Sequence, residues 1–182
     1  AEYDEKGLLT VYGSVQNPLG LLKDLSACLA MDEDKLRVVI RPDGGAFGGR
    51  EEPSVHIQAA LGTLMTGRPV RMVFSREELN IFSTKRHAMK MHYKVGATKD
   101  GKLMAIKADI VGDTGAYASS GEFVLFRACV FGGGPYEYPN AWMDSYAVYT
   151  NNVPAASMRG FGSTQPSVAS ECIMDRLAEA CG

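Results

Sequence analysis

Two apolar segments enclose the tetrapeptide Lys99-Asp100-Gly101-Lys102, and this feature constrains the fold more than any other in the chain. The segments are residues 89–98 and 103–111, and an Asp-Gly pair between two such runs is a strong signal for a β-hairpin. A tight hairpin can join only antiparallel strands. The sequence therefore predicts one antiparallel pair of strands in the second half of the chain.

Strand and helix patterns are mixed along the rest of the sequence. The further predicted strands are residues 8–12, 36–40, 70–74 and 141–150. The predicted helices are residues 18–31, 53–65, a short helix opened by Ser75, 122–131 and 163–180. Residues 112–117 and 132–135 are expected to be loops. This mixture predicts an α+β fold, in one lobe or in two lobes of about residues 1–85 and 86–182.

Composition excludes several classes of protein. A net charge of −2 gives no basic surface for nucleic acid, and no apolar run approaches the length of a membrane span. The polar opening residues do not resemble a signal peptide. Cys28, Cys129 and Cys172 lie in apolar sequence without CxxC spacing, which predicts reduced, buried thiols and a cytoplasmic location.

The most informative loop is the segment Gly44-Gly45-Ala46-Phe47-Gly48-Gly49-Arg50-Glu51. Glycine allows close backbone approach and positive φ, and a loop that leads into a helix can present free N–H groups to an electronegative ligand. The loop matches neither the P-loop nor the dinucleotide-binding pattern, so a dinucleotide site is disfavoured. An ordinary turn between a strand and a helix is the alternative for this loop alone.

A second glycine-flanked loop covers residues 151–162 and carries Arg159 and Phe161. An arginine in such a loop can bind phosphate or carboxylate with two hydrogen bonds. An aromatic ring held between two glycines can stack on a planar ligand, and packing in the core is the alternative.

Together, the first loop and the second loop's Met158-Arg159-Gly160-Phe161-Gly162 resemble two signature segments of the xanthine dehydrogenase/aldehyde oxidase family of molybdenum hydroxylases. The segment Gly112-Asp113-Thr114-Gly115-Ala116-Tyr117 is similar to bacterial members. Gln16 and Arg127 precede the two loops at the family's spacing. The resemblance covers essentially the whole chain and implies part of the family's molybdenum-binding domain.

The resemblance implies a molybdenum–molybdopterin cofactor without a direct protein ligand to the metal. Gln16 would donate a hydrogen bond to an oxygen of the molybdenum centre, and a turn-stabilising role is the alternative. Arg159 would fix the cofactor-side loop. The implied cofactor-binding residues are Gln16, Gly45, Ala46, Phe47, Gly48 and Arg159.

The resemblance also implies a substrate-reading pair, Glu51 and Arg127, with Phe161 stacking on an aromatic substrate. Gln16, Glu51 and Arg127 are the implied catalytic residues. A carboxylate can accept from a ring N–H, and a guanidinium can stabilise negative charge on a heterocycle. The alternative for Glu51 is complementation of the dipole of the following helix.

The expected parent enzyme oxidises a purine or related N-heterocycle with water as oxygen source. There are two alternatives: a subunit of an aldehyde oxidoreductase, or a non-catalytic module for assembly or binding. The family's general base and most of its pterin contacts lie further downstream, so we expect a catalytically incomplete fragment. Its expected partners are the remainder of the molybdopterin subunit, iron–sulfur and FAD domains or subunits, and a small heterocycle or aldehyde.

Overall fold

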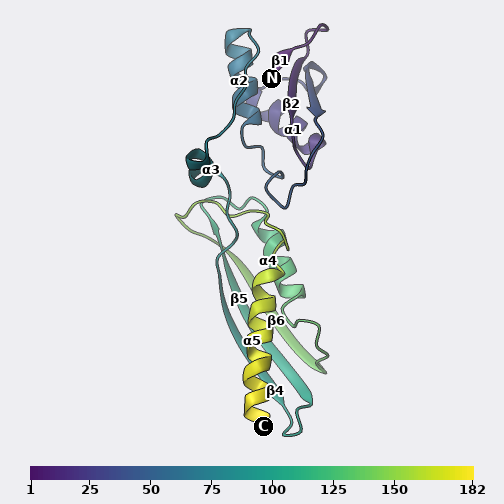
Figure 1. Ribbon diagram of the computed structural model, residues 1–182, viewed down its shortest axis with the longest axis vertical. Coiled ribbons are helices and arrows are strands. Elements are labelled where there is room, and N and C mark those ends of the chain that lie inside the picture. The colour runs from purple at the N-terminus through teal and green to yellow at the C-terminus, as the bar shows by residue number, and fades with distance from the viewer. The chain divides into compact units, whose positions relative to one another are not determined.

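The computed structural model describes residues 1–182, which divide into two compact units, residues 1–83 and 84–182 (Figure 1). Each unit contains a three-stranded mixed sheet with helices packed against it. The predicted α+β class is confirmed by this arrangement.

The sheet of the first unit has the order β1-β2-β3. Strand β1 (Glu2–Tyr3) pairs antiparallel with β2 (Leu9–Gly13), and β2 pairs parallel with β3 (Leu36–Ile40). The connection between β2 and β3 is helix α1 (Pro18–Leu29), followed by a short 3-10 turn at Glu33–Lys35. The core of this unit lies between the sheet and the helices. Its buried residues are Leu9, Val11, Val15, Leu21, Leu25, Leu36 and Ala60.

Helix α1 begins where its sequence predicts. The side chain of Asn17 accepts a hydrogen bond from the backbone N–H of Gly20, and Pro18 occupies the first turn, where a missing N–H costs nothing. The helix ends at Ala30, whose backbone is left-handed. The end of β2 and the start of α1 therefore hold Gln16 in a short, well-defined connection.

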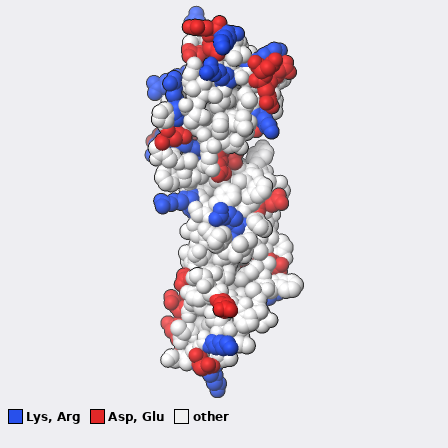
Figure 2. All heavy atoms as spheres, turned by 90° about the vertical axis from the view of Figure 1, so that its right-hand side faces the viewer, with Lys and Arg blue, Asp and Glu red and all other residues white.

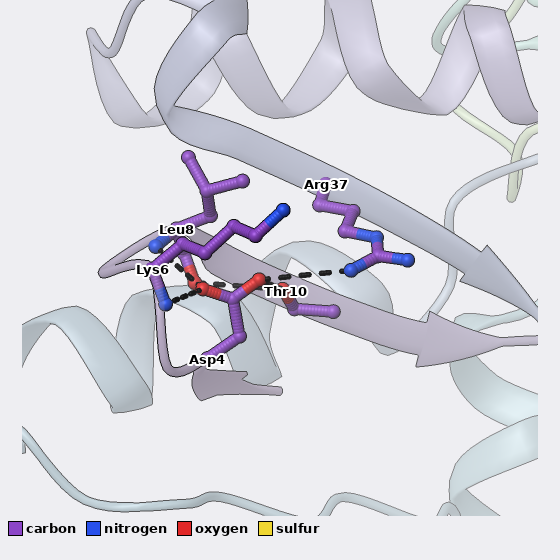
Figure 3. A network of polar contacts seen from close by, with 5 residues as sticks. All are labelled: Asp4, Lys6, Leu8, Thr10 and Arg37. Atoms are coloured by element: carbon purple, nitrogen blue, oxygen red, sulfur yellow. Dashed lines mark hydrogen bonds and ion pairs between the residues drawn. The ribbon is translucent and has the colours of Figure 1, made fainter.

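Asp4 joins the start of the first unit to β2 and β3 (Figure 3). Its carboxylate accepts from the backbone N–H groups of Lys6 and Leu8 and from the Thr10 hydroxyl, and it lies 3.7 Å from Arg37. The hydrogen bond from Leu8, followed by the other donors and by the Arg37 charge, holds the pKa of Asp4 below its ordinary value.

Helix α2 (His56–Thr66) begins three residues later than predicted, and it ends at the left-handed Gly67 as predicted. Helix α3 (Arg76–Phe82) opens with a capping box between Ser75 and Glu78, which confirms Ser75 as its N-cap.

The predicted strand at residues 70–74 is wrong. Only Val70 exchanges backbone hydrogen bonds, with Ala1, and residues 71–74 have no neighbouring strand. A segment with strand-forming residues becomes a strand only when another strand lies beside it and forms hydrogen bonds with it.

The second unit contains the predicted hairpin. Strands β4 (Met89–Ala97) and β5 (Leu103–Gly115) pair antiparallel, and β5 pairs parallel with β6 (Asn140–Tyr149), its partner on the other side. Strand β5 continues to Gly115, so the predicted loop at residues 112–117 is wrong over its first four residues. The reason is the parallel pairing with the end of β6, which local sequence does not reveal.

Helix α4 (Gly121–Val130) connects β5 to β6 and packs on both, while helix α5 (Thr164–Cys181) packs on β4 and α4. Figure 1 shows α5 running along the sheet. The core between sheet and helices contains Ala108, Ile110, Val124, Leu125 and Ala128.

The four cysteines are free, as predicted, but the prediction that they are buried is wrong. Cys28 and Cys172 are exposed and Cys129 is half-buried. Apolar neighbours in sequence, such as Leu25 for Cys28 and Ala128 for Cys129, lie on the buried side of the same helices. No helix combines the length and the apolar character that crossing a membrane requires.

Candidate functional site

The first glycine loop is shaped by left-handed backbone at three positions. Phe47 has φ 54°, and Gly45 and Gly48 have φ values of 117° and 91°. The N–H of Gly49 donates to the carbonyl of Ala46 at 2.8 Å and closes a turn around Phe47. A side chain at Gly45 would collide with the Phe47 ring, because an added Cβ would lie 2.6 Å from it. The glycines therefore allow Phe47 to project, 62% exposed, from the loop.

The free N–H groups of this site belong to the loop and not to a helix. Residues 52–55 separate the loop from α2, so the expectation that it leads directly into a helix is wrong. The backbone N–H groups of Gly45, Ala46 and Gly48 donate no hydrogen bond within the chain. Uncommitted donors beside an exposed aromatic ring fit a ligand with electronegative atoms and a planar body.

Gln16 and Glu51 are brought together by the first unit. The side-chain amide of Gln16 donates to Oε1 of Glu51 at 3.1 Å, and its backbone N–H donates to the carbonyl of Arg50 at 2.8 Å. Arg50 also forms an ion pair with Asp43, which closes the base of the loop. These contacts place a carboxylate and an amide side by side at the edge of the glycine loop.

The alternative for Glu51, complementation of the α2 dipole, is wrong. The first turn of α2 contains no acidic residue, and Glu51 lies five positions before its first residue, His56. The effect of a helix dipole falls off within the first turn. The side chain of Glu51 instead accepts the hydrogen bond from Gln16.

The second glycine loop also holds a phenylalanine in left-handed backbone next to glycines with positive φ. Phe161 has φ 47° between Gly160 and Gly162, whose φ values are 94° and 97°. The Phe161 N–H donates to the Met158 carbonyl at 2.7 Å. An added Cβ on Gly162 would lie 2.1 Å from the carbonyl of Val124, so only glycine lets this loop lie against α4.

Arg127 and Phe161 meet in the second unit. The Arg127 guanidinium carbon lies 5.9 Å from the centroid of the Phe161 ring and 5.3 Å from that of Phe131. The Phe161 ring is half-buried against the core of this unit, so core packing, one of the two roles that sequence left open, is observed, and ligand stacking stays a prediction. Arg127 itself is exposed and has no carboxylate partner.

Arg159 is exposed, and two hydrogen bonds anchor its backbone. Its carbonyl accepts from the guanidinium of Arg86 at 2.8 Å and from the Thr164 hydroxyl at 3.4 Å. These two bonds tie the second loop to the segment before β4 and to the start of α5. Sequence reasoning missed Arg86, because the two residues stand 73 positions apart and no local pattern links them.

Asp113, at the end of β5, anchors the second loop to this strand. Its carboxylate accepts from Thr150 at 2.6 Å, from Asn152 at 2.5 Å and from the backbone N–H of Gly115 at 2.8 Å. The Thr150 hydrogen bond, followed by those from Asn152 and Gly115, holds the pKa of Asp113 below its ordinary value. Sequence reasoning assigned this residue no role.

The site residues predicted from sequence fall into two groups. Gln16, Phe47 and Glu51 belong to the first unit, and Arg127, Arg159 and Phe161 belong to the second. No cluster of three or more His, Cys, Asp or Glu side chains is arranged to hold a metal ion. The donors that these groups offer are amides, guanidinium groups and loop N–H groups.

Comparison with known proteins identifies the family. The model of the molybdopterin cofactor-binding domain matches residues 1–182. The chain belongs to this family. It is 48% identical over 180 residues to the nicotinate dehydrogenase large molybdopterin subunit of Eubacterium barkeri, covering 99% of this chain and 42% of that protein.

Further relatives place the domain in the same group of oxidoreductases. It is 38% identical to a probable xanthine dehydrogenase subunit of Bacillus subtilis, over 98% of this chain and 24% of that protein. The solved aldehyde oxidoreductase from Desulfovibrio gigas superimposes with a TM-score of 0.94 at 31% identity, over 100% of this chain and 20% of that one. The domain thus spans less than half the length of each of these relatives.

Proposed function

We propose that this molybdopterin cofactor-binding domain forms one wall of the active site of a molybdenum hydroxylase that oxidises an aromatic N-heterocycle, with water as the oxygen source. The observation that carries the proposal is the 3.1 Å hydrogen bond between Gln16 and Glu51 beside the glycine loop. It joins the amide that would face the cofactor to the carboxylate that would face the substrate.

The residues of the first loop fit the cofactor. The N–H groups of Gly45, Ala46 and Gly48 would donate to its electronegative atoms, and the projecting Phe47 ring would cover one side of it. The side-chain amide of Gln16 has two N–H donors, so it can hold Glu51 with one and donate to a cofactor oxygen with the other. When bound, the molybdenum cofactor supplies the two-electron oxidation.

The proposed substrate-reading residues supply complementary chemistry. Glu51 would accept a hydrogen bond from a ring N–H, which orients a heterocycle. Arg127, without a carboxylate partner, would stabilise negative charge on the ring or on a substituent of it. Phe161 would stack on the aromatic ring, and Arg159 would hold the second loop in shape. The relatives include a nicotinate dehydrogenase and a probable xanthine dehydrogenase, which supports this substrate class.

An aldehyde substrate is the second candidate. It is supported by the match to an aldehyde oxidoreductase at a TM-score of 0.94. An aldehyde has no ring N–H for Glu51 to recognise, so the two candidates differ in their dependence on this carboxylate.

The proposed partners are the remainder of the molybdopterin subunit, together with domains or subunits that carry iron–sulfur clusters and FAD. They would complete the site, with the general base, and carry the electrons away. A cytoplasmic location is proposed with them, supported by the four free cysteines.

The test is Glu51→Val in the complete enzyme. We expect the kcat/KM for xanthine, which carries ring N–H groups, to fall at least about tenfold, because a charge-assisted hydrogen bond contributes roughly 1.5–3 kcal/mol. The kcat/KM for benzaldehyde should change by less than about threefold. An equal loss on both kinds of substrate would show that Glu51 is structural and would contradict the proposal.

A further inference from the structure

Arg127 stands between two aromatic rings that come from different parts of the second unit. Phe131 follows the last turn of α4, one helical turn after Arg127, and Phe161 lies in the second glycine loop. The guanidinium carbon is 5.3 Å from the Phe131 centroid and 5.9 Å from the Phe161 centroid. Both distances fall within the range of a cation–π interaction.

The position of Phe131 relative to Arg127 is set by the helix end. The backbone N–H of Phe131 donates to the Arg127 carbonyl at 3.0 Å, and residues four apart on a helix are neighbours on its surface. Phe131 is not part of the core cluster, and its side chain is 45% exposed. Packing of the core therefore does not explain why an aromatic ring occupies this place.

The surroundings of Arg127 leave its hydrogen-bonding edge available. No carboxylate forms an ion pair with it, and its side-chain N–H groups donate no hydrogen bond within the chain. An aromatic ring attracts a cation through its π face without accepting the in-plane N–H bonds that a carboxylate would take. A cation held in this way keeps its donors for a ligand.

We propose that Phe131 is a positioning residue, whose ring restricts the rotamers of Arg127 and presents the guanidinium edge to the substrate. The inference rests on the proposed role of Arg127 in binding the heterocycle, and it adds a residue that acts through Arg127. A long side chain loses conformational freedom when it binds, and prior restriction by the ring reduces that loss. Phe131 thereby strengthens the interaction of Arg127 with a negatively charged or carbonyl-bearing ring.

The experiment measures steady-state kinetics of the complete holoenzyme with xanthine or nicotinate, whichever it oxidises faster. We expect Phe131→Leu to lower kcat/KM about 2- to 30-fold, the range that corresponds to a cation–π interaction. In an Arg127→Met background the same substitution should have no further effect. Phe131→Trp, which keeps an aromatic face, should restore at least half of the lost kcat/KM.

The matched control is Phe126→Leu on the same helix. Phe126 is 65% exposed and makes no cation–π contact with Arg127, so its substitution should leave kcat/KM unchanged.

An equal loss from Phe131→Leu in the wild-type and Arg127→Met backgrounds would overturn the inference, and so would failure of Phe131→Trp to restore activity. If Arg127→Met itself leaves turnover intact, the role proposed for Arg127 fails together with the inference. If Arg127→Met impairs turnover and Phe131→Leu does not, only the inference fails.

Discussion

At the scale of single residues, both glycine loops hold a phenylalanine in left-handed backbone. Phe47 and Phe161 have φ values of 54° and 47°, a conformation that costs a non-glycine residue roughly 1 kcal/mol or more. Glycines with positive φ lie within two positions on either side of each phenylalanine. Strain retained at two matching positions is typical of sites where a side chain has to point in a particular direction for function.

Gly45 and Gly44 provide a matched test of this arrangement. Gly45→Ala places a Cβ 2.6 Å from the Phe47 ring at a φ of 117°, whereas a Cβ on Gly44 meets nothing within 4 Å. In the complete enzyme, we expect Gly45→Ala to lower molybdenum occupancy several-fold, because local strain of about 1–3 kcal/mol displaces the ring. Gly44→Ala should retain occupancy, measured by metal analysis. Equal occupancy in the two variants would contradict the importance of the loop's shape.

At the scale of elements, the end of β5 decides where the second loop lies. Gly115 has φ 73°, and an added Cβ would lie 2.4 Å from the Val153 carbonyl, so the loop passes directly over the strand. The Thr150 N–H donates to the Gly115 carbonyl, and the Ala155 N–H donates to the Thr114 carbonyl. The carboxylate of Asp113 adds side-chain hydrogen bonds at the same junction, and these bonds hold the start of the loop that carries Phe161.

Asp113→Asn should weaken this junction. The depressed pKa of Asp113 means that its carboxylate stabilises the folded state above the unfolded pKa of about 3.8. That contribution is lost as the pH falls below 3.8 and through the folded pKa. We therefore expect the variant to have a lower Tm than wild type at about pH 7 and a smaller difference at about pH 3, measured by calorimetry of the complete enzyme.

Asp109→Asn is the matched control on the same strand. Asp109 lies on the exposed side of β5 and its ionic partner is the exposed His92 at 4.0 Å, an arrangement that contributes little to stability. This variant should keep the Tm of wild type at about pH 7. A Tm loss for Asp113→Asn that stays constant from about pH 7 to about pH 3 would show that charge is not the reason.

At the scale of the whole molecule, each unit has a small core and leaves large apolar side chains exposed. In the second unit these include Phe123, Phe126, Val130, Trp142 and Tyr149, each more than 60% exposed. In Figure 2, uncharged atoms cover much of the face drawn over this unit, between scattered charged groups. Apolar surface of this extent is typical of regions that other parts of a protein cover.

The 182-residue chain by itself should therefore bind molybdopterin poorly. The two groups of site residues lie in different units, and the chain spans 42% of its nicotinate dehydrogenase relative, so many cofactor contacts are expected elsewhere. We expect a Kd at least about 100-fold weaker than that of the complete subunit, measured by pterin fluorescence; a loss of about 2.7 kcal/mol corresponds to that ratio. Tight one-to-one binding by the isolated chain would contradict this expectation.

The sequence by itself determined the hairpin at Asp100-Gly101, the start of α1 at Pro18, the cap at Ser75 and the two glycine loops, because these features depend on backbone preferences of a few neighbouring residues. It also placed Gln16, Glu51, Arg127 and Phe161 in a candidate site through their resemblance to a family. Only the tertiary structure decided the extension of β5 to Gly115, the absence of a strand at residues 70–74 and the exposure of the cysteines. Each of these depends on whether a distant segment lies beside it.

The contacts within the site also depended on tertiary structure. The hydrogen bond from Gln16 to Glu51 spans 35 positions, and the one from Arg86 to Arg159 spans 73. Local patterns carry no information about such pairs. The stacking of Phe131 on Arg127 is the exception, since its four-residue spacing on a predicted helix could have been found from sequence. The hairpin that constrained the fold most is thus a local feature, whereas the site is made by long-range contacts.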